Sequence, residues 1–471
     1  MTLTLPFDTS YARLPAQMYS FVDPTPVSKP ALIKLNSPLA QSLGLDATSL
    51  RTEDGIAFLA GNSSADGATP LAQAYAGHQF GQWNPQLGDG RAVLLGEIVA
   101  PNGHRFDVQL KGAGRTPYSR MGDGRAWLGP VLREYIVSEA MFALGVPTTR
   151  ALAAVTTGDP VYRDAILPGA ILTRVASSHI RVGTFQYFAA RQDIEALRAL
   201  TDHVVTRHYP HCNGLADLLR SVVARQAKLI AKWTSIGFIH GVMNTDNMTI
   251  SGETIDYGPC AFLDEYDAGK VFSSIDRQGR YAYGNQPRIG VWNLAQFATA
   301  LVPLADDQAA AVEEFTQIIN EFADIYDSER RTILAAKLGL SASGEASEAL
   351  AEGLLRLMAQ YGADFTLTFA ALANGKIPPD FESSPEFSAW EREWRAHNPD
   401  QELMCRTNPQ IIPRNHQIER VIQAGVKGDF KPFEALLEAV TAPFTPLTPD
   451  TAPFAAPPEP QQRVTQTFCG T

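Results

Sequence analysis

Carboxylate and amide side chains recur along the stretch HGVMNTDNMTISGETIDYG, which runs from His240 to Gly258. The stretch reads as two short strands joined by a Ser-Gly-Glu turn, Met248 to Ile250 and Thr254 to Ile255. A hairpin of this length would bring Asp246, Asn247 and Asp256 to one edge. Their oxygen atoms suit a hard cation such as Mg²⁺, which usually keeps water and phosphate in the rest of its shell. The stretch therefore predicts a site for a divalent ion and a phosphorylated ligand.

The order of these residues matches the catalytic and metal loops of small-molecule phosphotransferases that have a kinase fold. Asn247 follows His240 by seven residues, and Asp256 opens an Asp-x-Gly motif nine residues after Asn247. Taken singly, such residues also occur in ordinary turns, so the ordered set is what predicts a site. Those enzymes place a proton-accepting Asp two residues after the His, where this chain has Val242. The nearby candidate is Asp246, and the residues leave open which reaction it serves.

A glycine-rich stretch and a lysine precede this site. The stretch ends before a predicted strand, Arg91 to Val99, and its glycines are Gly77, Gly81, Gly88 and Gly90. Glycines let a backbone approach phosphate oxygens closely. The segment HRFDVQLKGAG alternates apolar and polar residues, so Lys111 ends a second strand. A lysine beside a glycine-rich loop is typical of nucleotide binding, although a solvated lysine at a strand end gives the same pattern.

A second loop, GAGRTPYSRMGDGRAWL, contains Asp123 and Gly124 and leads into a predicted helix from Pro130 to Leu144. This helix carries two glutamates that could pair with Lys111, Glu134 and Glu139. Helical spacing puts Glu139 nearer the apolar stripe. Because a buried acid needs a partner, geometry alone favours Glu139.

Residues 148 to 190 read as strands separated by turns and include the segment HIRVGTFQYF. Arg174 and Arg181 lie there and suit planar recognition of phosphate, although arginine is also common as surface charge. Residues 191 to 239 and 289 to 440 show helical spacing, with a long irregular loop after Asp256. The histidines near Cys212 do not have the spacing of a common zinc site.

Composition limits the class of protein. The chain has 471 residues, 45% of them hydrophobic, which is enough for a large core and two or three lobes. The net charge of −11 argues against a protein that coats nucleic acid. We find no secretion signal or mitochondrial presequence in the first 30 residues, and no apolar run of membrane-spanning length. The four scattered cysteines fit a reducing setting, so we expect a cytoplasmic protein without nucleic-acid or membrane partners.

These patterns predict an α+β fold with two lobes, like that of a protein kinase. The N-terminal lobe would be mainly β with one main helix, and the C-terminal lobe would be helical with extensions. We expect four regions: a wrapping N-terminal arm at 1–70, the N-terminal lobe at 71–190, the helical lobe at 191–440 and a mobile Pro-rich tail at 441–471.

Six segments together resemble the selenoprotein O family, the bacterial YdiU group. They run from Tyr75 to Glu419 and are YAGHQFGQWNPQLGDGRA, QLKGAGRTPYSRMGDGRAWL, REYIVSEAM, HGVMNTDNM, IDYGPCAFLDEY and PRNHQIE. The resemblance implies a kinase fold that looks like a pseudokinase but transfers AMP. The implied reaction is protein adenylylation, in which AMP from ATP joins a Ser, Thr or Tyr hydroxyl and pyrophosphate leaves. Bacterial members of the family also use UTP.

The resemblance also implies roles for single residues. Asp246 would accept the proton, and Asn247 and Asp256 would hold Mg²⁺ or Mn²⁺. The residues in contact with nucleotide would be Gly88, Gly90, Arg91, Lys111, Asp123, Gly124, Arg174 and Arg181. The family's Lys–Glu pair falls on Lys111 and Glu134, against the helical-wheel preference for Glu139. In the family ATP lies reversed relative to a kinase, so that its α-phosphate faces the acceptor.

Family members carry a Cys or selenocysteine near the C-terminus, which is Cys469 here. In some relatives a second Cys, in the loop after the metal-binding Asp, is associated with redox control. The loop from Phe262 to Gly279 contains no Cys, so the sequence does not predict this disulfide.

Overall fold

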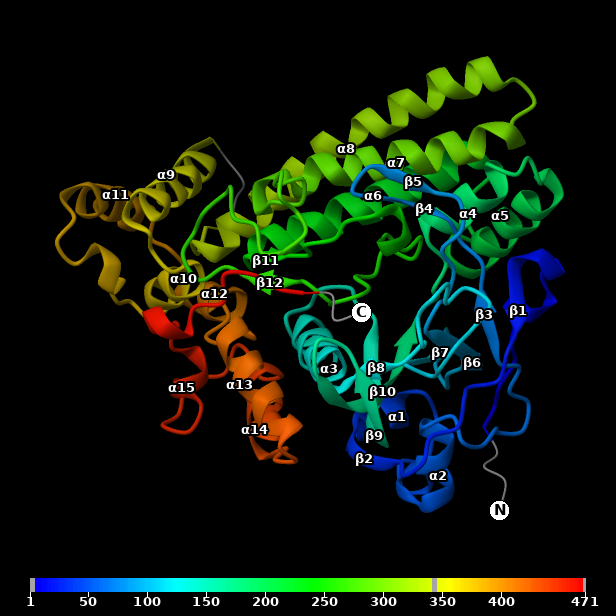
Figure 1. Cartoon of the computed structure of the whole chain (residues 1–471). Coiled ribbons are helices and arrows are strands. Elements are labelled where there is room, and N and C mark those ends of the chain that lie inside the picture. Colours follow the sequence, from blue (N-terminus) through cyan, green and yellow to red (C-terminus); the bar gives the residue numbers. More distant parts are fainter. Residues whose placement is uncertain (1–4, 341–344, 469–471) are drawn as a thin grey trace.

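One lobe is built on a β-sheet and the other from helices (Figure 1) in the computed structural model, which describes residues 5–340 and 345–468. The main sheet has the strand order β1-β3-β6-β7-β10-β9-β2, with β8 paired to β10, and these pairs are antiparallel. Its strands are β1 Tyr19–Phe21, β2 Ala31–Leu35, β3 Leu71–Gln73, β6 Ala92–Val99, β7 Arg105–Lys111, β8 Ala126–Trp127, β9 Arg150–Tyr162 and β10 Ile166–Ala176. The predicted α+β class is confirmed.

Helices cover both faces of this sheet. Successive side chains of a strand point to opposite faces, so neighbouring strand residues pack against different helices. On one face Leu94 and Leu172 pack with helix α3, Leu128–Ala143. On the other face Val93 and Ile171 pack with the helices of the N-terminal segment, α1 Ser37–Ser42 and α2 Glu53–Leu59. The sheet therefore fixes α3 beside the end of β7, where Lys111 lies.

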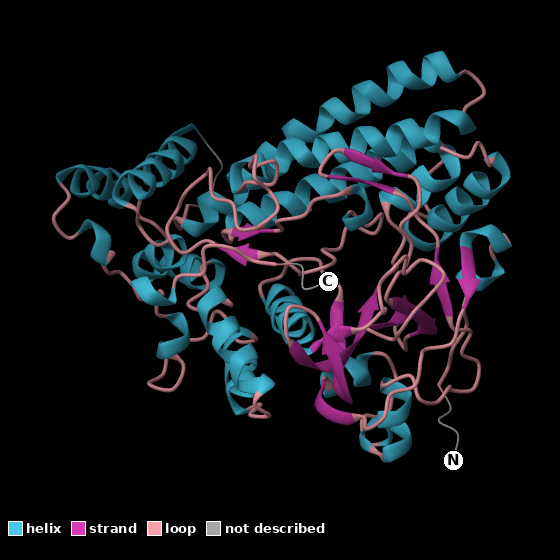
Figure 2. Cartoon of the chain, in the orientation of Figure 1, coloured by secondary structure: helices cyan, strands magenta, loops and turns pink. Residues whose placement is uncertain are grey.

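The helical lobe is arranged around α6 and α8, which pack side by side (Figure 2). The helices that follow the sheet in the chain are α4 Val182–Ala189, α5 Ile194–His208, α6 Leu215–Ser235, α7 Gln286–Leu301, α8 Gln308–Lys337, α9 Glu345–Tyr361, α10 Phe365–Ala373, α11 Pro385–Ala396, α12 Gln401–Thr407, α13 Asn415–Val426, α14 Lys431–Val440 and α15 Ala452–Ala455. The 3-10 helices of the described residues are η1 Tyr11–Arg13, η2 Ala16–Met18, η3 Ser49–Arg51, η4 Thr245–Asn247, η5 Tyr283–Asn285, η6 Val302–Leu304, η7 Pro379–Phe381 and η8 Pro460–Gln462. Helices α13 and α14 return to α3, which they contact on the side away from the sheet (Figure 1).

Two local predictions are wrong. The segment HIRVGTFQYF contains helix α4 rather than a strand, and this helix packs on α5 and α7. The strands expected at 248–250 and 254–255 do not pair with each other. Instead Thr249 forms a bridge with Arg181 and Thr254 forms one with Thr148, so both segments attach to the sheet lobe. The strand pair in this part of the chain is β11 Phe238–Ile239 with β12 Ala261–Phe262, and between them lies the segment 240–260.

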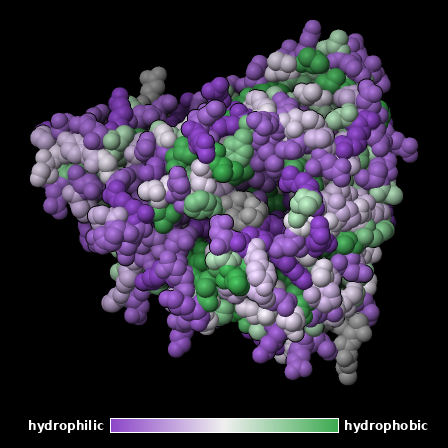
Figure 3. Space-filling model, viewed as in Figure 1, coloured by the Kyte–Doolittle hydropathy of each residue, from purple (hydrophilic) through white to green (hydrophobic). Residues whose placement is uncertain are grey.

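Hydrophilic residues cover much of the face seen in Figure 3, with apolar residues in smaller patches. Among the described residues, no helix combines the length and the apolar composition that a membrane span requires. At the end of the described chain Thr467 is buried, and its backbone N–H donates to the carbonyl of Phe272 at 2.7 Å. Cys469 lies outside the described residues.

Candidate active site

Four ionisable side chains from four segments meet where the sheet adjoins α3. Nζ of Lys111 lies 2.6 Å from Oε2 of Glu134 and 2.5 Å from Oδ1 of Asp256. Arg174 of β10 contacts Glu134 at 2.5 Å and lies 3.8 Å from Asp256. The Asp256 side chain is 24% exposed, whereas the other three are at most 9% exposed. Two cations and two anions therefore compensate each other, with one carboxylate open to a ligand.

Burial and neighbouring charge act in opposite directions on these two acids. Burial disfavours the ionised form of Glu134, but Arg174 and Lys111 hold its pKa below the usual range. Burial likewise opposes ionisation of Asp256, and Lys111 and Arg174 hold its pKa well below the usual range. The backbone of Asp256 has a φ of +66°, a left-handed conformation that is uncommon outside glycine and concentrates at functional sites. Asp256 is thus a carboxylate whose ionised form is favoured by two neighbouring cations.

Lys111 pairs with Glu134, so the helical-wheel preference for Glu139 is wrong. Glu139 instead accepts hydrogen bonds from Arg150 at 2.8 and 2.6 Å, from Asn36 at 2.7 Å and from a backbone N–H. The wheel argument failed because α3 is buried on nearly every side, between the sheet and helices α13 and α14. An apolar stripe cannot single out one glutamate on such a helix.

The two glycine-rich loops pack against each other near this cluster. The hydroxyl of Ser119 donates to the carbonyl of Gly90. Gly88 has a φ of +73°, and a Cβ atom there would lie 2.3 Å from the ring of Tyr118, so a larger residue would not fit. Next to them, Nη1 of Arg91 is buried without a hydrogen-bond partner in the described chain, and this charge lowers the pKa of Asp256. The loop thus presents glycine backbone and an unpaired cationic group to the same region.

Asp123 and Gly124 lie in the outer part of the second loop. Gly124 accepts a hydrogen bond from the backbone N–H of Gly114 at 3.0 Å, which closes the loop. Asp123 is exposed and pairs with Arg163 at 2.8 Å. Within residues 5–340 and 345–468 no hydrogen bond or ion pair joins Asp123 to the Lys111 cluster, so Asp123 lies apart from that cluster.

Arg181 lies at the N-terminus of α4 and is buried, as is Arg174, which excludes the surface-charge alternative for both. The Arg181 guanidinium lies 4.3 Å from the centre of the Tyr75 ring and 3.6 Å from Asp89. Burial opposes this positive charge, but Tyr75, Asp89 and Asp246 raise the pKa of Arg181. A buried cation therefore lies on the side of the site that holds Asp246.

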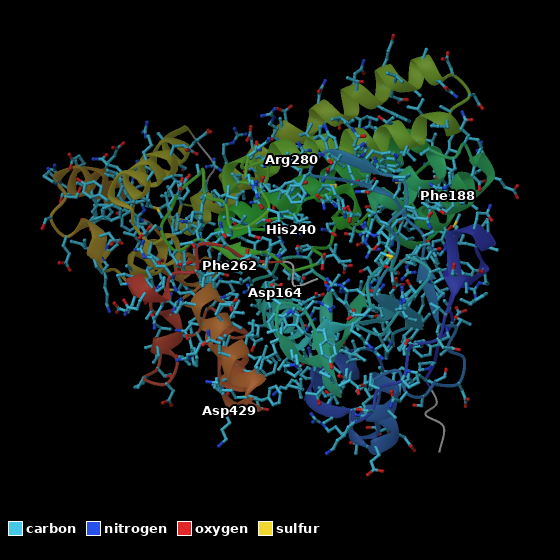
Figure 4. All side chains as sticks on the ribbon, in the orientation of Figure 1. Asp164, Phe188, His240, Phe262, Arg280 and Asp429 are labelled. Carbon is cyan, nitrogen blue, oxygen red and sulfur yellow. The ribbon has the colours of Figure 1, made fainter. Side chains whose placement is uncertain are left out.

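The segment between β11 and β12 carries the candidate proton acceptor. His240 follows β11 and lies near Phe262 of β12 (Figure 4), and its Nε2 is 2.9 Å from the carbonyl of Ile255. Asp246 is 8% exposed, and its Oδ1 is buried without a hydrogen-bond partner in the described chain. Burial raises the pKa of Asp246 to about 6. A carboxyl with such a pKa is suited to proton transfer near neutral pH.

Asn247 and Asp256 offer oxygen atoms that fit a hard divalent ion. Asn247 donates through Nδ2 to the carbonyl of Val242 at 3.1 Å, which leaves Oδ1 for another partner. Among the described residues no three His, Cys, Asp or Glu side chains form a metal-binding group. A site of one amide and one carboxylate needs water and phosphate to complete its shell, so its chemistry fits an ion that arrives with a nucleotide.

A hairpin that the sequence did not predict covers this segment. Its strands are β4 Gly77–Gln79 and β5 Gln82–Asn84. The backbone N–H of His78 donates to Oγ1 of Thr245 at 2.7 Å, and that of Phe80 donates to Oδ1 of Asn244 at 3.1 Å. The two turn residues, Phe80 and Gly81, have φ values of +52° and +81°, as in a type I′ turn. The sequence signal for this hairpin is the Phe80-Gly81 pair between two short polar runs, which by itself indicates only a loop.

Comparison with known proteins identifies the family of the chain. A profile of the family described as "Protein adenylyltransferase SelO" matches residues 1–441. The chain is 59% identical over 477 residues to the "Protein nucleotidyltransferase YdiU" of Jannaschia sp., and the match covers 99% of each chain. Relatives of the same name from Roseobacter denitrificans and Methylorubrum populi are 56% and 54% identical, with 100% of each chain covered. With these matches over its full length, the chain belongs to the SelO family of protein adenylyltransferases.

Proposed function

We propose that this protein transfers AMP from ATP to Ser, Thr or Tyr hydroxyls of other proteins and releases pyrophosphate. Membership of the SelO family supports the reaction class. One observation carries the proposal: buried Val242 stands where hydroxyl kinases have their Asp, while the buried Asp246 keeps an unpaired carboxylate oxygen. Asn247 and Asp256 stand where those kinases have their metal-binding residues, but the candidate proton acceptor, Asp246, stands at a different position from the kinase Asp. This difference suits attack at a different phosphorus atom of the nucleotide.

In this reaction the acceptor oxygen bonds to the α-phosphorus, and the bond from that phosphorus to the pyrophosphate oxygen breaks. Asp246 takes the proton of the acceptor hydroxyl. Lys111, Arg174 and Arg181 bind phosphate oxygens and neutralise the leaving group, since such transfers depend on positioning and charge stabilisation. Further contacts to the nucleotide come from Gly88, Gly90, Arg91, Asp123 and Gly124. UTP serves as a second donor, because most of these contacts fall on the phosphates.

Asn247 and Asp256 would hold Mg²⁺ or Mn²⁺ in this proposal. The ion, when bound, supplies positive charge that neutralises phosphate oxygens. Two features of the chain support this pair: the Asp256 carboxylate is held ionised, and Nδ2 of Asn247 is already used by Val242.

The test is a paired labelling assay. The protein is incubated with cell extract and Mg²⁺ or Mn²⁺, once with ATP labelled at the α-phosphate and once with ATP labelled at the γ-phosphate. We expect protein-bound label from α only, and its loss in Asp246→Asn. Label from γ only would indicate a kinase, and label from neither would indicate a nucleotide-binding scaffold.

We also propose the four regions 1–70, 71–190, 191–440 and 441–471 as arm, N-terminal lobe, helical lobe and tail. A cytoplasmic location is proposed as well. Cys212, Cys260 and Cys405 are free thiols, which supports a reducing compartment. The proposed partners are protein substrates, without nucleic acid or membrane.

A further inference from the structure

One face of the β4–β5 hairpin lies against Asp246. In the hairpin register Gly77 is opposite Asn84 and Gln79 is opposite Gln82, so these four residues share a face. A Cβ atom on Gly77 would lie 2.9 Å from Oδ1 of Asp246. Gly77 therefore lets the hairpin backbone approach the carboxylate more closely than any other residue would.

On the same face Gln79 bonds to the other carboxylate oxygen. Its Nε2 donates to Oδ2 of Asp246 at 3.0 Å, and this is the side-chain hydrogen bond that the carboxylate makes in the described chain. Oδ1 of Asp246 is left without one. The bond thus restrains one oxygen of Asp246, while the other lies buried beside Gly77.

A second hydrogen bond fixes which way the Gln79 amide faces. Nδ2 of Asn84 donates to Oε1 of Gln79 at 3.2 Å. A carboxamide has one accepting and one donating end, so an oxygen engaged by Asn84 leaves the NH₂ group for Asp246. If the amide turned over, its oxygen would face the carboxylate and the contact would become repulsive.

The backbone of the hairpin is fixed independently of these side chains. His78 and Phe80 donate their N–H groups to Thr245 and Asn244, the two residues before Asp246. On the opposite face the ring of His78 lies 5.2 Å from that of Trp292 in α7. A rigid element therefore carries Gln79, as positioning of a reactive group requires.

We propose that Gln79, oriented by Asn84, is a positioning residue that holds the Asp246 carboxylate in the orientation needed to accept the proton of the acceptor hydroxyl. This inference rests on the proposed function and adds a residue to it. Gln79 acts through Asp246 and not through the nucleotide, so it sets the rate of transfer and leaves ATP binding unchanged.

The test measures kcat and the KM for ATP in the α-label assay, together with the melting temperature. We expect Gln79→Met to lower kcat about 10- to 100-fold, because a misplaced catalytic group slows reaction by such factors, with the KM for ATP within about twofold of wild type. Asn84→Asp keeps the size of the side chain but cannot donate to Oε1. It should turn the Gln79 amide over and lower kcat in the same way.

Gln82→Met is the matched control, since Gln82 lies opposite Gln79 in the hairpin and is exposed. Its kcat should equal that of wild type. A Gln79→Met kcat within twofold of wild type, or a raised KM with unchanged kcat, would overturn the inference. If Gln79→Met melts early, Asn84→Asp decides the question by the same criterion. Absence of α label from wild type would instead defeat the proposed function.

Discussion

At the scale of single residues, the site separates two aspartates by their surroundings. Asp256 lies against Lys111 and near Arg174, which keep it ionised, whereas Asp246 is buried and keeps an unpaired oxygen. Two acids in such different environments can take two different roles, one as an ion ligand and one as a proton acceptor.

The ion-ligand role predicts the effect of Asp256→Ala. We expect transfer of α label to fall by at least about 100-fold, since loss of a charge-stabilising group in the transition state costs this much or more. Asp267→Ala is the control, because Asp267 is an exposed aspartate of the following loop, and in the described chain its carboxylate accepts a hydrogen bond from the nearby backbone N–H of Gly269. Near-normal turnover of Asp256→Ala would contradict the assignment of the metal site.

A second prediction concerns Lys337, at the end of α8. Lys337 is 2% exposed, its ammonium lies 4.3 Å over the ring of Phe369, and no carboxylate of the described residues forms an ion pair with it. Burial lowers the pKa of Lys337 from 10.5 to about 7. Between these two values the unfolded chain binds the proton and the folded chain does not, so this lysine destabilises the fold most at pH 7 and below.

Lys337→Met should therefore raise the free energy of unfolding at pH 7 by roughly 2–4 kcal/mol, and the gain should shrink as the pH rises towards 10. Denaturant unfolding at pH 7, 8.5 and 10 measures this. Lys228→Met on α6 is the control, because Lys228 is exposed and should give no pH-dependent gain. A gain that is equal at all three pH values would rule out the titration of Lys337 as its cause.

At the scale of elements, helix α3 is fixed from both sides. Glu134 joins it to Lys111 of the sheet, and Arg133 pairs with Glu419 of α13. Tyr135 packs against Phe433 of α14 with ring centroids 5.6 Å apart. The sheet thus fixes the face of α3 that carries Glu134, and the C-terminal helices support the helix from its other side.

Removing the contact between α13 and α3 should lower the free energy of unfolding. Glu419→Ala leaves the buried Arg133 without its carboxylate, and since Glu419 is itself 40% exposed we expect a loss of about 1–2 kcal/mol in the free energy of unfolding. Glu434→Ala on α14 is the comparison, because its contact with Lys34 is 3.8 Å long and exposed. That variant should lose less than about 0.5 kcal/mol. Equal losses would show that the Arg133–Glu419 pair has no special role.

At the scale of the whole molecule, buried charges tie the lobes together. Arg207 of α5 is 5% exposed and contacts Asp107 of β7 at 2.6 Å and Glu97 of β6 at 3.3 Å. Asp107 also lies 2.9 Å from Nδ1 of His179. The helical lobe is therefore held to the sheet by an arginine whose two acids lie inside the sheet lobe.

Arg207→Met should destabilise the whole protein, because it leaves two buried carboxylates with fewer cations. We expect the free energy of unfolding to fall by about 3–5 kcal/mol, with a single cooperative transition at lower denaturant concentration. Arg198→Met on the same helix is exposed and should change little. Two separate transitions in Arg207→Met would indicate that the lobes unfold independently.

Part of this architecture could be predicted from the sequence. Alternating and helical spacing predicted the strand that ends at Lys111 and the helix near 130–144, which lies at Leu128–Ala143. The partner of Lys111 could not be chosen by helical spacing, because tertiary packing surrounds α3. Helix α4 and the β4–β5 hairpin were missed because their short segments depend on contacts with α7 and η4, which are distant in sequence.

The contact between Lys111 and Asp256 also bears on the order in which ligands enter. The Lys111 ammonium contacts Oδ1 of Asp256, so a divalent ion that binds this carboxylate must compete with it. A triphosphate gives that ammonium a new anionic partner, and ion and nucleotide should therefore bind cooperatively. We expect Mn²⁺ affinity, measured by electron paramagnetic resonance, to rise about tenfold when a non-hydrolysable nucleotide is present. Lys111→Met should raise the affinity of the nucleotide-free protein and abolish most of this coupling.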